Sequence, residues 1–159
     1  MKGLIRFALA FGVLAVAMVG ATSASAGNGG TDRPWKASGT MIGPVDFTTL
    51  NFSVEGTAIG AHYGKGTVQV DGNLLGGFVS KTTAANGDTI TFQFASQSGD
   101  LSGILCPAGF VAFKNYQDVT GGTGRFAGAS GTVLVGGCFG IDDNATLTIT
   151  FTASGAINY

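Results

Sequence analysis

The chain has 159 residues, of which 28 are glycine and only 11% are charged. Its formal net charge is −1, and the charges are scattered, so the sequence lacks the basic cluster that binds nucleic acid or an anionic membrane surface. The length suits one domain with a core of its own.

The first 26 residues have the three parts of a secretory signal peptide. Lys2 and Arg6 form a basic start, residues 7–19 an apolar middle, and Ala24-Ser25-Ala26 a small-residue cleavage motif before Gly27. The apolar stretch is shorter than the ~20 residues that a membrane-spanning helix needs. We therefore expect an exported protein, periplasmic or secreted and of bacterial origin, with no transmembrane segment after processing. Without Lys2 and Arg6, six basic residues face nine acidic ones, a net charge of −3.

The polar, glycine-rich residues 27–34 are interpreted as a flexible leader, and one domain is expected over 35–159. Within this domain no segment has helical periodicity. Apolar and polar residues alternate instead, as where Ile90, Phe92 and Phe94 are separated by threonine and glutamine, which is typical of strands with one buried face. Eight strands are predicted, near 35–42, 48–58, 63–71, 75–83, 88–96, 101–118, 125–138 and 145–157, with an interruption of the sixth around Pro107 as an alternative.

Turn sequences separate these predicted strands at short intervals. Asn86-Gly87 accepts the positive φ angles of a hairpin turn, and Asp142-Asp143-Asn144 marks another reversal. Many short strands without crossover helices predict an all-β fold, either a sandwich or a closed antiparallel barrel. Glycines expected inside strands favour the barrel, because they permit the sharp coiling that closure requires. These glycines are Gly56, Gly60, Gly76, Gly77, Gly128 and Gly131.

The stretch TGGTGRFAGASG, residues 120–131, has the glycine content of a phosphate-binding loop. Such a loop needs a helix after it, because the helix N-terminus holds the phosphate. The residues that follow Gly131 are strand-like, so the phosphate-binding interpretation fails. Gly121, Gly122 and Gly124 are predicted to be structural glycines of a turn.

Residues 116–131 as a whole resemble the penultimate strand, turn and strand of dirigent proteins and allene oxide cyclases. They resemble more closely still a group of small exported bacterial proteins that share this barrel, in which the strand after the turn begins with Arg-Phe or a similar pair. Shorter matching pieces lie at 55–58, 85–89 and 147–155. The resemblance implies an eight-stranded antiparallel barrel of the allene oxide cyclase/dirigent type, and by the same route a homo-oligomer. Plant members guide oxylipin cyclisation or radical coupling of phenols, but none of their functional residues can be carried over to a position of this chain.

Cys106 and Cys138 are predicted to form a disulfide, because an even number of cysteines in an exported chain favours a bridge over free thiols. In the chain-entropy model, closing a loop of about 33 residues contributes roughly 4 kcal/mol.

His62, Glu55 and Tyr63 are the candidates for acid–base chemistry, since imidazole titrates near neutral pH. The neighbouring glycines make a plain connection between strands the simpler interpretation. One histidine and two bridged cysteines leave few metal ligands, so neither a metal nor a cofactor is expected.

Aromatic side chains favour a binding function. Phe52, Phe92 and Phe94 are predicted to face the interior of the barrel, which at eight strands is either filled or just able to hold one small ligand. A filled core is the simpler interpretation. The functional one is a non-catalytic module that binds a small apolar or phenolic ligand or is associated with the cell envelope. The alternatives are a cyclase/dirigent-type enzyme that guides a reactive intermediate and an outer-membrane barrel ending at Tyr159, the latter disfavoured by short strands without aromatic belts.

Overall fold

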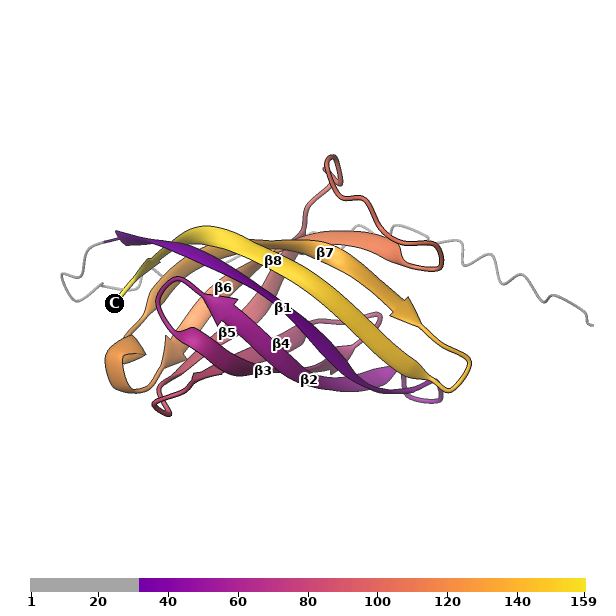
Figure 1. Ribbon diagram of the computed structural model, residues 1–159, viewed down its shortest axis with the longest axis horizontal. Helices are drawn as coiled ribbons and strands as arrows, with labels where there is room; N and C mark the ends of the chain where they lie inside the picture. The colour runs from indigo at the N-terminus through magenta and orange to yellow at the C-terminus, as the bar shows by residue number, and fades with distance from the viewer. Residues whose placement is uncertain (1–31) are drawn as a thin grey trace, which may run out of the picture.

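The computed structural model describes residues 32–159, which form a closed barrel of eight antiparallel strands (Figure 1). Each strand pairs with the next along the chain, and β1 pairs with β8 to close the barrel. The strands are β1 (Asp32–Asp46), β2 (Asn51–Gly60), β3 (Gly64–Asn73), β4 (Phe78–Ala84), β5 (Thr89–Gln97), β6 (Val111–Gly122), β7 (Ser130–Ile141) and β8 (Thr146–Asn158). The predicted fold class is confirmed.

The predicted signal peptide over 1–26 and most of the predicted leader lie outside the described residues. The barrel itself begins at Asp32, slightly before the predicted boundary at residue 35, because Asp32 pairs with Asn158 of β8. In residues 32–159, no helix has the length and apolar character needed to cross a membrane.

Two predicted strands begin later than expected. The predicted strand 101–118 is β6, which starts only at Val111, because residues 98–110 form a loop in which Pro107 and several glycines interrupt the alternation. The predicted strand 125–138 is β7, which starts at Ser130. Arg125 and Phe126 therefore do not open a strand and lie in a short 3-10 helix, η1 (Gly124–Phe126). Of the glycines predicted inside strands, Gly76, Gly77 and Gly128 lie in connections instead.

The alternation of the sequence places apolar side chains inside the barrel and polar ones outside. Val68 and Val70 of β3, for example, are buried, whereas Thr67 and Gln69 between them are exposed. The main hydrophobic cluster accordingly includes buried residues from all eight strands and η1.

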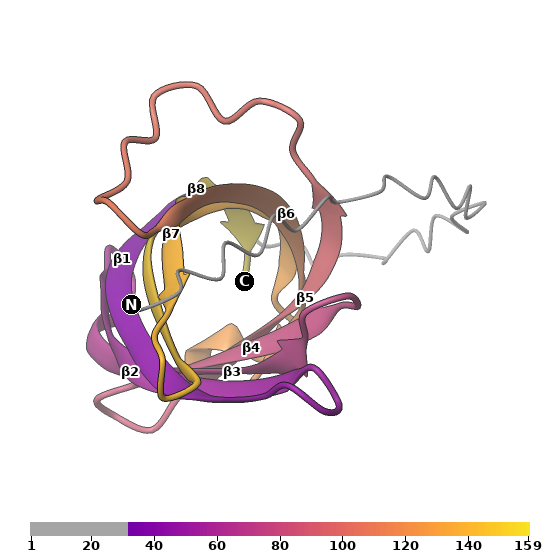
Figure 2. The ribbon, with the colours of Figure 1, turned by 90° about the vertical axis from the view of Figure 1, so that its right-hand side faces the viewer.

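The two ends of the barrel differ in what closes them. The plug end carries the β2–β3 and β4–β5 turns, η1, and the start of β1 beside the end of β8. The loop end carries the β1–β2, β3–β4 and β7–β8 turns and the loop 98–110, which arches outside the ring of strands (Figure 2). The predicted disulfide is present: Cys106 of this loop is bonded to Cys138 of β7.

Candidate functional site

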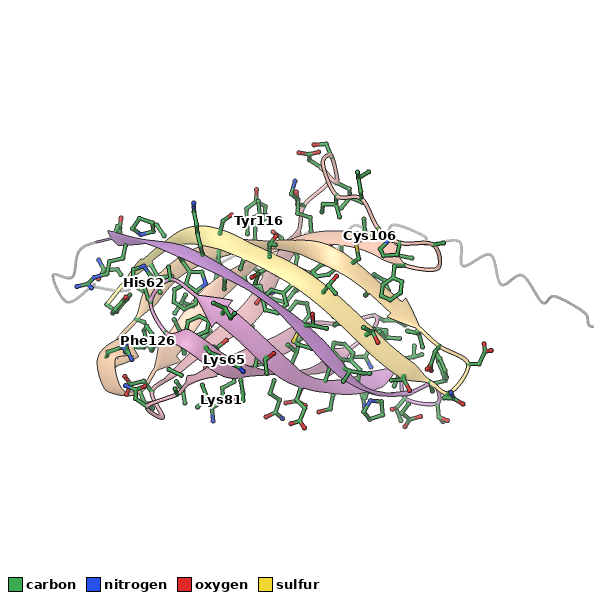
Figure 3. The ribbon with its side chains drawn as sticks, in the orientation of Figure 1. His62, Lys65, Lys81, Cys106, Tyr116 and Phe126 are labelled. Atoms are coloured by element: carbon green, nitrogen blue, oxygen red, sulfur yellow. A yellow bond between two sulfur atoms is a disulfide. The ribbon has the colours of Figure 1, made fainter. Side chains whose placement is uncertain are left out.

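An aromatic plug closes one end of the barrel; it consists of Trp35, His62, Tyr63, Phe92, Phe126 and Tyr159. Trp35, only 2% exposed, lies at its centre, with its ring centroid 5.3 Å from that of Tyr63 and 5.7 Å from that of Phe92. Phe126 of η1 is fully buried and packs edge-on against Tyr159, with 5.0 Å between ring centroids. His62 and Phe126 accordingly lie together at this end (Figure 3).

Arg125 links η1 to two neighbouring turns on the outside of the plug. Its Nε donates to Asp88 Oδ2 in the β4–β5 turn at 2.9 Å, and its Nη1 donates to the carbonyl oxygen of His62 in the β2–β3 turn at 3.0 Å. The hydrogen bond from Arg125 is the main reason why the pKa of Asp88 is lowered. The glycine stretch thus has a structural function: Gly121 and Gly122 end β6, and Gly124 turns the chain so that Phe126 enters the barrel while Arg125 stays outside.

A cavity of about 470 Å³ occupies the barrel between the plug and the loop end. Trp35, Tyr63 and Phe92 of the plug line it, as do Leu101 and Val111 at the loop end. Of these lining residues, Leu101 and Val111 at the loop end are exposed to solvent, whereas Trp35 at the plug end is buried. The cavity therefore opens at the loop end. The expectation of a filled core is therefore wrong.

Small and polar side chains on the inner face explain why the core is not filled. Ala37 and Ala153 line the cavity from β1 and β8, and Ser80 and Thr82 line it from β4. None of these side chains reaches far toward the barrel axis. Phe52, Phe92 and Phe94, the residues predicted to face the interior, also line the cavity and give it aromatic walls, with Phe94 packed on Phe78 at 5.3 Å between ring centroids.

A buried hydrogen-bonded chain crosses this otherwise apolar interior. Ser80 Oγ donates to Gln117 Oε1 at 3.1 Å, and Gln117 Nε2 donates to Asn115 Oδ1 at 3.1 Å. Ser80, Asn115 and Gln117 are each more than nine-tenths buried, and so is Thr82 beside them. All of them line the cavity. They give it a few neutral polar groups among aromatic and aliphatic walls, which is the usual make-up of a small-molecule site.

Sequence reasoning missed this polar chain for a physical reason. In β4, Val79 faces outward and is exposed, whereas Ser80 and Thr82 face inward, the opposite of an apolar-in pattern. In β6, Asn115 and Gln117 alternate with the equally polar residues Tyr116 and Asp118, so period two is invisible. The signal that the sequence offers is the apolar residue Val119, which lies two positions after Gln117 and is therefore on the same, buried face of β6.

The structure does not bring the three acid–base candidates together. Tyr63 lines the cavity, and burial raises its pKa to about 12, so its hydroxyl stays protonated. His62 lies in the β2–β3 turn, where its Nε2 donates to the carbonyl oxygen of Pro34 at 2.6 Å. Glu55 is exposed on the outer face of β2, and within residues 32–159 no hydrogen bond or ion pair joins it to His62 or Tyr63.

A second hollow, of about 660 Å³, lies outside the barrel under the loop 98–110. Its floor includes Thr40 of β1 and Thr150 and Thr152 of β8, and its roof includes Ile104 and Leu105 of the loop. Cys106 lies on this loop, outside the ring of strands (Figure 3). The described residues contain no group of three or more His, Cys, Asp or Glu side chains placed to hold a metal ion.

No model of a known protein family matches this chain, and no curated protein matches it. A solved structure of a pterocarpan synthase dirigent protein is similar over 81% of this chain and 84% of that chain, at 12% sequence identity and a TM-score of 0.44. At that score the likeness carries no weight of its own, and the description of the fold rests on the strand pairing alone.

Proposed function

We propose that this protein is an exported, non-catalytic module that binds one small apolar molecule inside its barrel. The observation that carries the proposal is the cavity of about 470 Å³, which is closed by the aromatic plug and open at the loop end. Its volume falls within the roughly 300–1,000 Å³ of typical ligand pockets.

The character of the cavity wall supports binding more than catalysis. Phe52, Phe92 and Phe94 offer aromatic contact area, and the buried polar groups are neutral hydroxyls and amides. The ionisable side chains of the described lining are Tyr63, held protonated by burial, and Lys114, whose Nζ lies 3.6 Å from Asp100 Oδ2. An enzyme of the cyclase/dirigent kind is the alternative, and Tyr63 is the candidate that it would have to use.

The disulfide supports the export part of the proposal. Bridges such as Cys106–Cys138 form and persist in oxidising compartments such as the bacterial periplasm or the extracellular medium. Cell fractionation that recovers the protein from the periplasm or the medium would agree with this part, and recovery from the cytoplasm with reduced cysteines would contradict it.

Energy transfer from Trp35 to a bound dye tests the cavity. Trp35 is the single tryptophan of the chain and lines the cavity, so it is a built-in reporter of occupancy. The neutral dye N-phenyl-1-naphthylamine should quench Trp35 emission in a saturable way with a stoichiometry of one. Ala153→Phe, which fills the cavity from β8, should weaken binding by about tenfold or more, equivalent to about 1.4 kcal/mol.

Thr152→Phe is the matched control, because Thr152 precedes Ala153 on β8 but faces the outer hollow. It should leave dye binding unchanged. Binding that survives Ala153→Phe and is lost in Thr152→Phe would place the dye outside the barrel and reject the proposal. Circular dichroism and thermal melting verify that both variants are folded.

A further inference from the structure

We propose that the cavity selects an uncharged, largely hydrocarbon molecule bearing a hydroxyl group, which Asn115 holds by its side-chain amide with Thr82 as a second polar contact. This inference rests on the proposed binding function and adds the chemical class of the ligand and the residues that select it.

Asn115 presents an unused hydrogen-bonding group to the cavity. The residue is 3% exposed, its Oδ1 accepts from Gln117 Nε2, and within residues 32–159 no group accepts a hydrogen bond from its Nδ2. Every fully enclosed side-chain nitrogen and oxygen of those residues has a partner. The amide nitrogen is therefore in contact with open space, and the cavity that Asn115 lines is that space.

Thr82 presents a second such group. It is buried and lines the cavity from the same face of β4 as Ser80. Within the described range no group bonds to its hydroxyl, and no enclosed polar atom there lacks a partner, so this hydroxyl too is in contact with the open space of the cavity. A polar group that loses contact with water without gaining a partner destabilises the complex. A pure hydrocarbon that fills the cavity has this effect at Thr82 and Asn115, whereas a ligand that offers an oxygen at this place avoids it.

The hydrogen-bonded chain favours a hydroxyl over other oxygen groups. In the observed arrangement, Ser80 donates to Gln117 and Gln117 donates to Asn115, so the Nδ2 of Asn115 is left as a free donor. If the side-chain amides of Asn115 and Gln117 are both rotated by about 180°, Asn115 donates to Gln117 and Gln117 donates to Ser80. Asn115 is then left with a free carbonyl oxygen. A hydroxyl can accept in the first arrangement and donate in the second, so it satisfies Asn115 in both.

The charges at the mouth disfavour an anionic ligand. Asp46, Asp142 and Asp143 lie in or beside the turns of the loop end, and Asp100 lies in the loop 98–110. Lys114, the cation of the described lining, is already paired with Asp100. Lys65 and Lys81 lie on the outside near the plug end, away from the mouth (Figure 3). A carboxylate would therefore meet like charge at the mouth and find no free cation inside.

Three eight-carbon ring compounds test the inference, with Trp35 emission as the readout: cyclooctane, cyclooctanol and cyclooctanecarboxylate at pH 7. None of them absorbs in the range of tryptophan, so the signal comes from the cavity wall. The alcohol should bind about fivefold to tenfold more tightly than the hydrocarbon, because it makes one hydrogen bond that the hydrocarbon leaves unmade. The carboxylate should bind most weakly.

Asn115→Leu, which keeps the branched shape and the number of side-chain heavy atoms, should remove most of the preference for the alcohol and leave the affinity for cyclooctane unchanged or higher. Thr82→Val should reduce the preference by a smaller factor. It keeps the Ser80–Gln117–Asn115 chain intact, so it remains informative if Asn115→Leu does not fold. Thr83→Val is the matched control, because it makes the same chemical change on the outer face of β4. This variant should retain the full preference for the alcohol.

The outcomes separate the two proposals. Equal binding of the alcohol and the hydrocarbon, or carboxylate binding as tight as alcohol binding, rejects the inference and leaves the binding function standing. A preference that survives both Asn115→Leu and Thr82→Val also rejects it. Failure of all three compounds and of N-phenyl-1-naphthylamine to reach the cavity rejects the binding function itself.

Discussion

Arg125 and Gly124 show how two adjacent residues close one end of the barrel. Gly124 has φ +58°, a left-handed conformation, and the carboxylate of Asp88 occupies the place where a Cβ would stand. The backbone can therefore approach the β4–β5 turn closely enough for Arg125 to reach both Asp88 and the carbonyl oxygen of His62.

Gly124→Ala should lower the free energy of unfolding by about 2–3 kcal/mol, since the new methyl group displaces Asp88 as well as straining the backbone. Gly64→Ala is the matched control, because Gly64 has φ +68° and open space around it. Backbone strain alone should cost it about 1–2 kcal/mol. Urea denaturation followed by Trp35 emission measures both losses, and equal losses would show that Asp88 moves aside without cost.

Asp88→Asn should make stability less dependent on acid pH. The pKa of Asp88 is lowered in the folded protein, chiefly by the hydrogen bond from Arg125. The carboxylate thus contributes stability above its unfolded pKa of about 3.8, and this contribution is lost as the pH falls through the lower folded value. The melting temperatures of wild type and variant should differ by a constant amount above about pH 5 and converge below it; a gap that widens in acid would contradict this sign.

At the scale of elements, the loop 98–110 is the segment that the barrel does not hold by strand pairing. It is mostly exposed, and Leu105, beside the bonded Cys106, is 94% exposed. The disulfide to Cys138 fixes its position over the outer hollow, and at its start Ser98 and Leu101 reach the mouth of the cavity. One covalent link therefore orients a segment that borders both hollows.

Replacing both Cys106 and Cys138 with serine should lower the free energy of unfolding by about 2–4 kcal/mol, because the unfolded chain regains the freedom that the bridge removes. Within the folded state the effect should be local. Amide hydrogen exchange should rise in residues 98–110 and stay slow in β6 and β7, whose backbones remain paired from Val111 to Asp118. Fast exchange along β7 would mean that the bridge also holds the sheet together.

Elements determined by the chemistry of adjacent residues were predicted correctly, whereas features determined by contacts with neighbouring strands and turns were missed. The Asn86-Gly87 turn formed as predicted, because Gly87 adopts φ +88° whatever surrounds it. The predicted start of β7 was wrong. Arg125 and Phe126 lie in η1 instead, because Arg125 bonds to Asp88 and Phe126 packs in the plug. Ser80 and Asn115 were not assigned to an inner face, because both are polar and polar residues also occupy the outer face beside them.

At the scale of the whole molecule, closure rests on β1 and β8, the two ends of the described chain. They pair along most of their length, and Asp32 is the register partner of Asn158. The start and end of the barrel are thus neighbours at the plug end, where Tyr159 also packs on Phe126. The cavity owes its closed floor to this arrangement, since Trp35 near the start of β1 lies within the same cluster.

A circular permutant tests whether closure needs a continuous chain at any particular turn. Joining Tyr159 to Asp32 by a short glycine–serine linker and opening the β7–β8 turn between Asp143 and Asn144 preserves every strand pair of the barrel. It disturbs the hydrogen bonds of this turn: Asp142 Oδ1 accepts from the backbone of Asn144 and Thr146, and the backbone of Asp142 is bonded to that of Ala145 and Thr146. The permutant should fold, with a loss of about 1–3 kcal/mol. It should bind N-phenyl-1-naphthylamine as the parent does, because every side chain of the plug and of the polar chain is retained. Opening β3 between Gln69 and Val70 instead should prevent folding, since it cuts two ladders of the sheet. If the permutant opened at Asp143 fails to fold while the β3 permutant folds, the view that strand pairing around the whole ring determines the barrel is wrong.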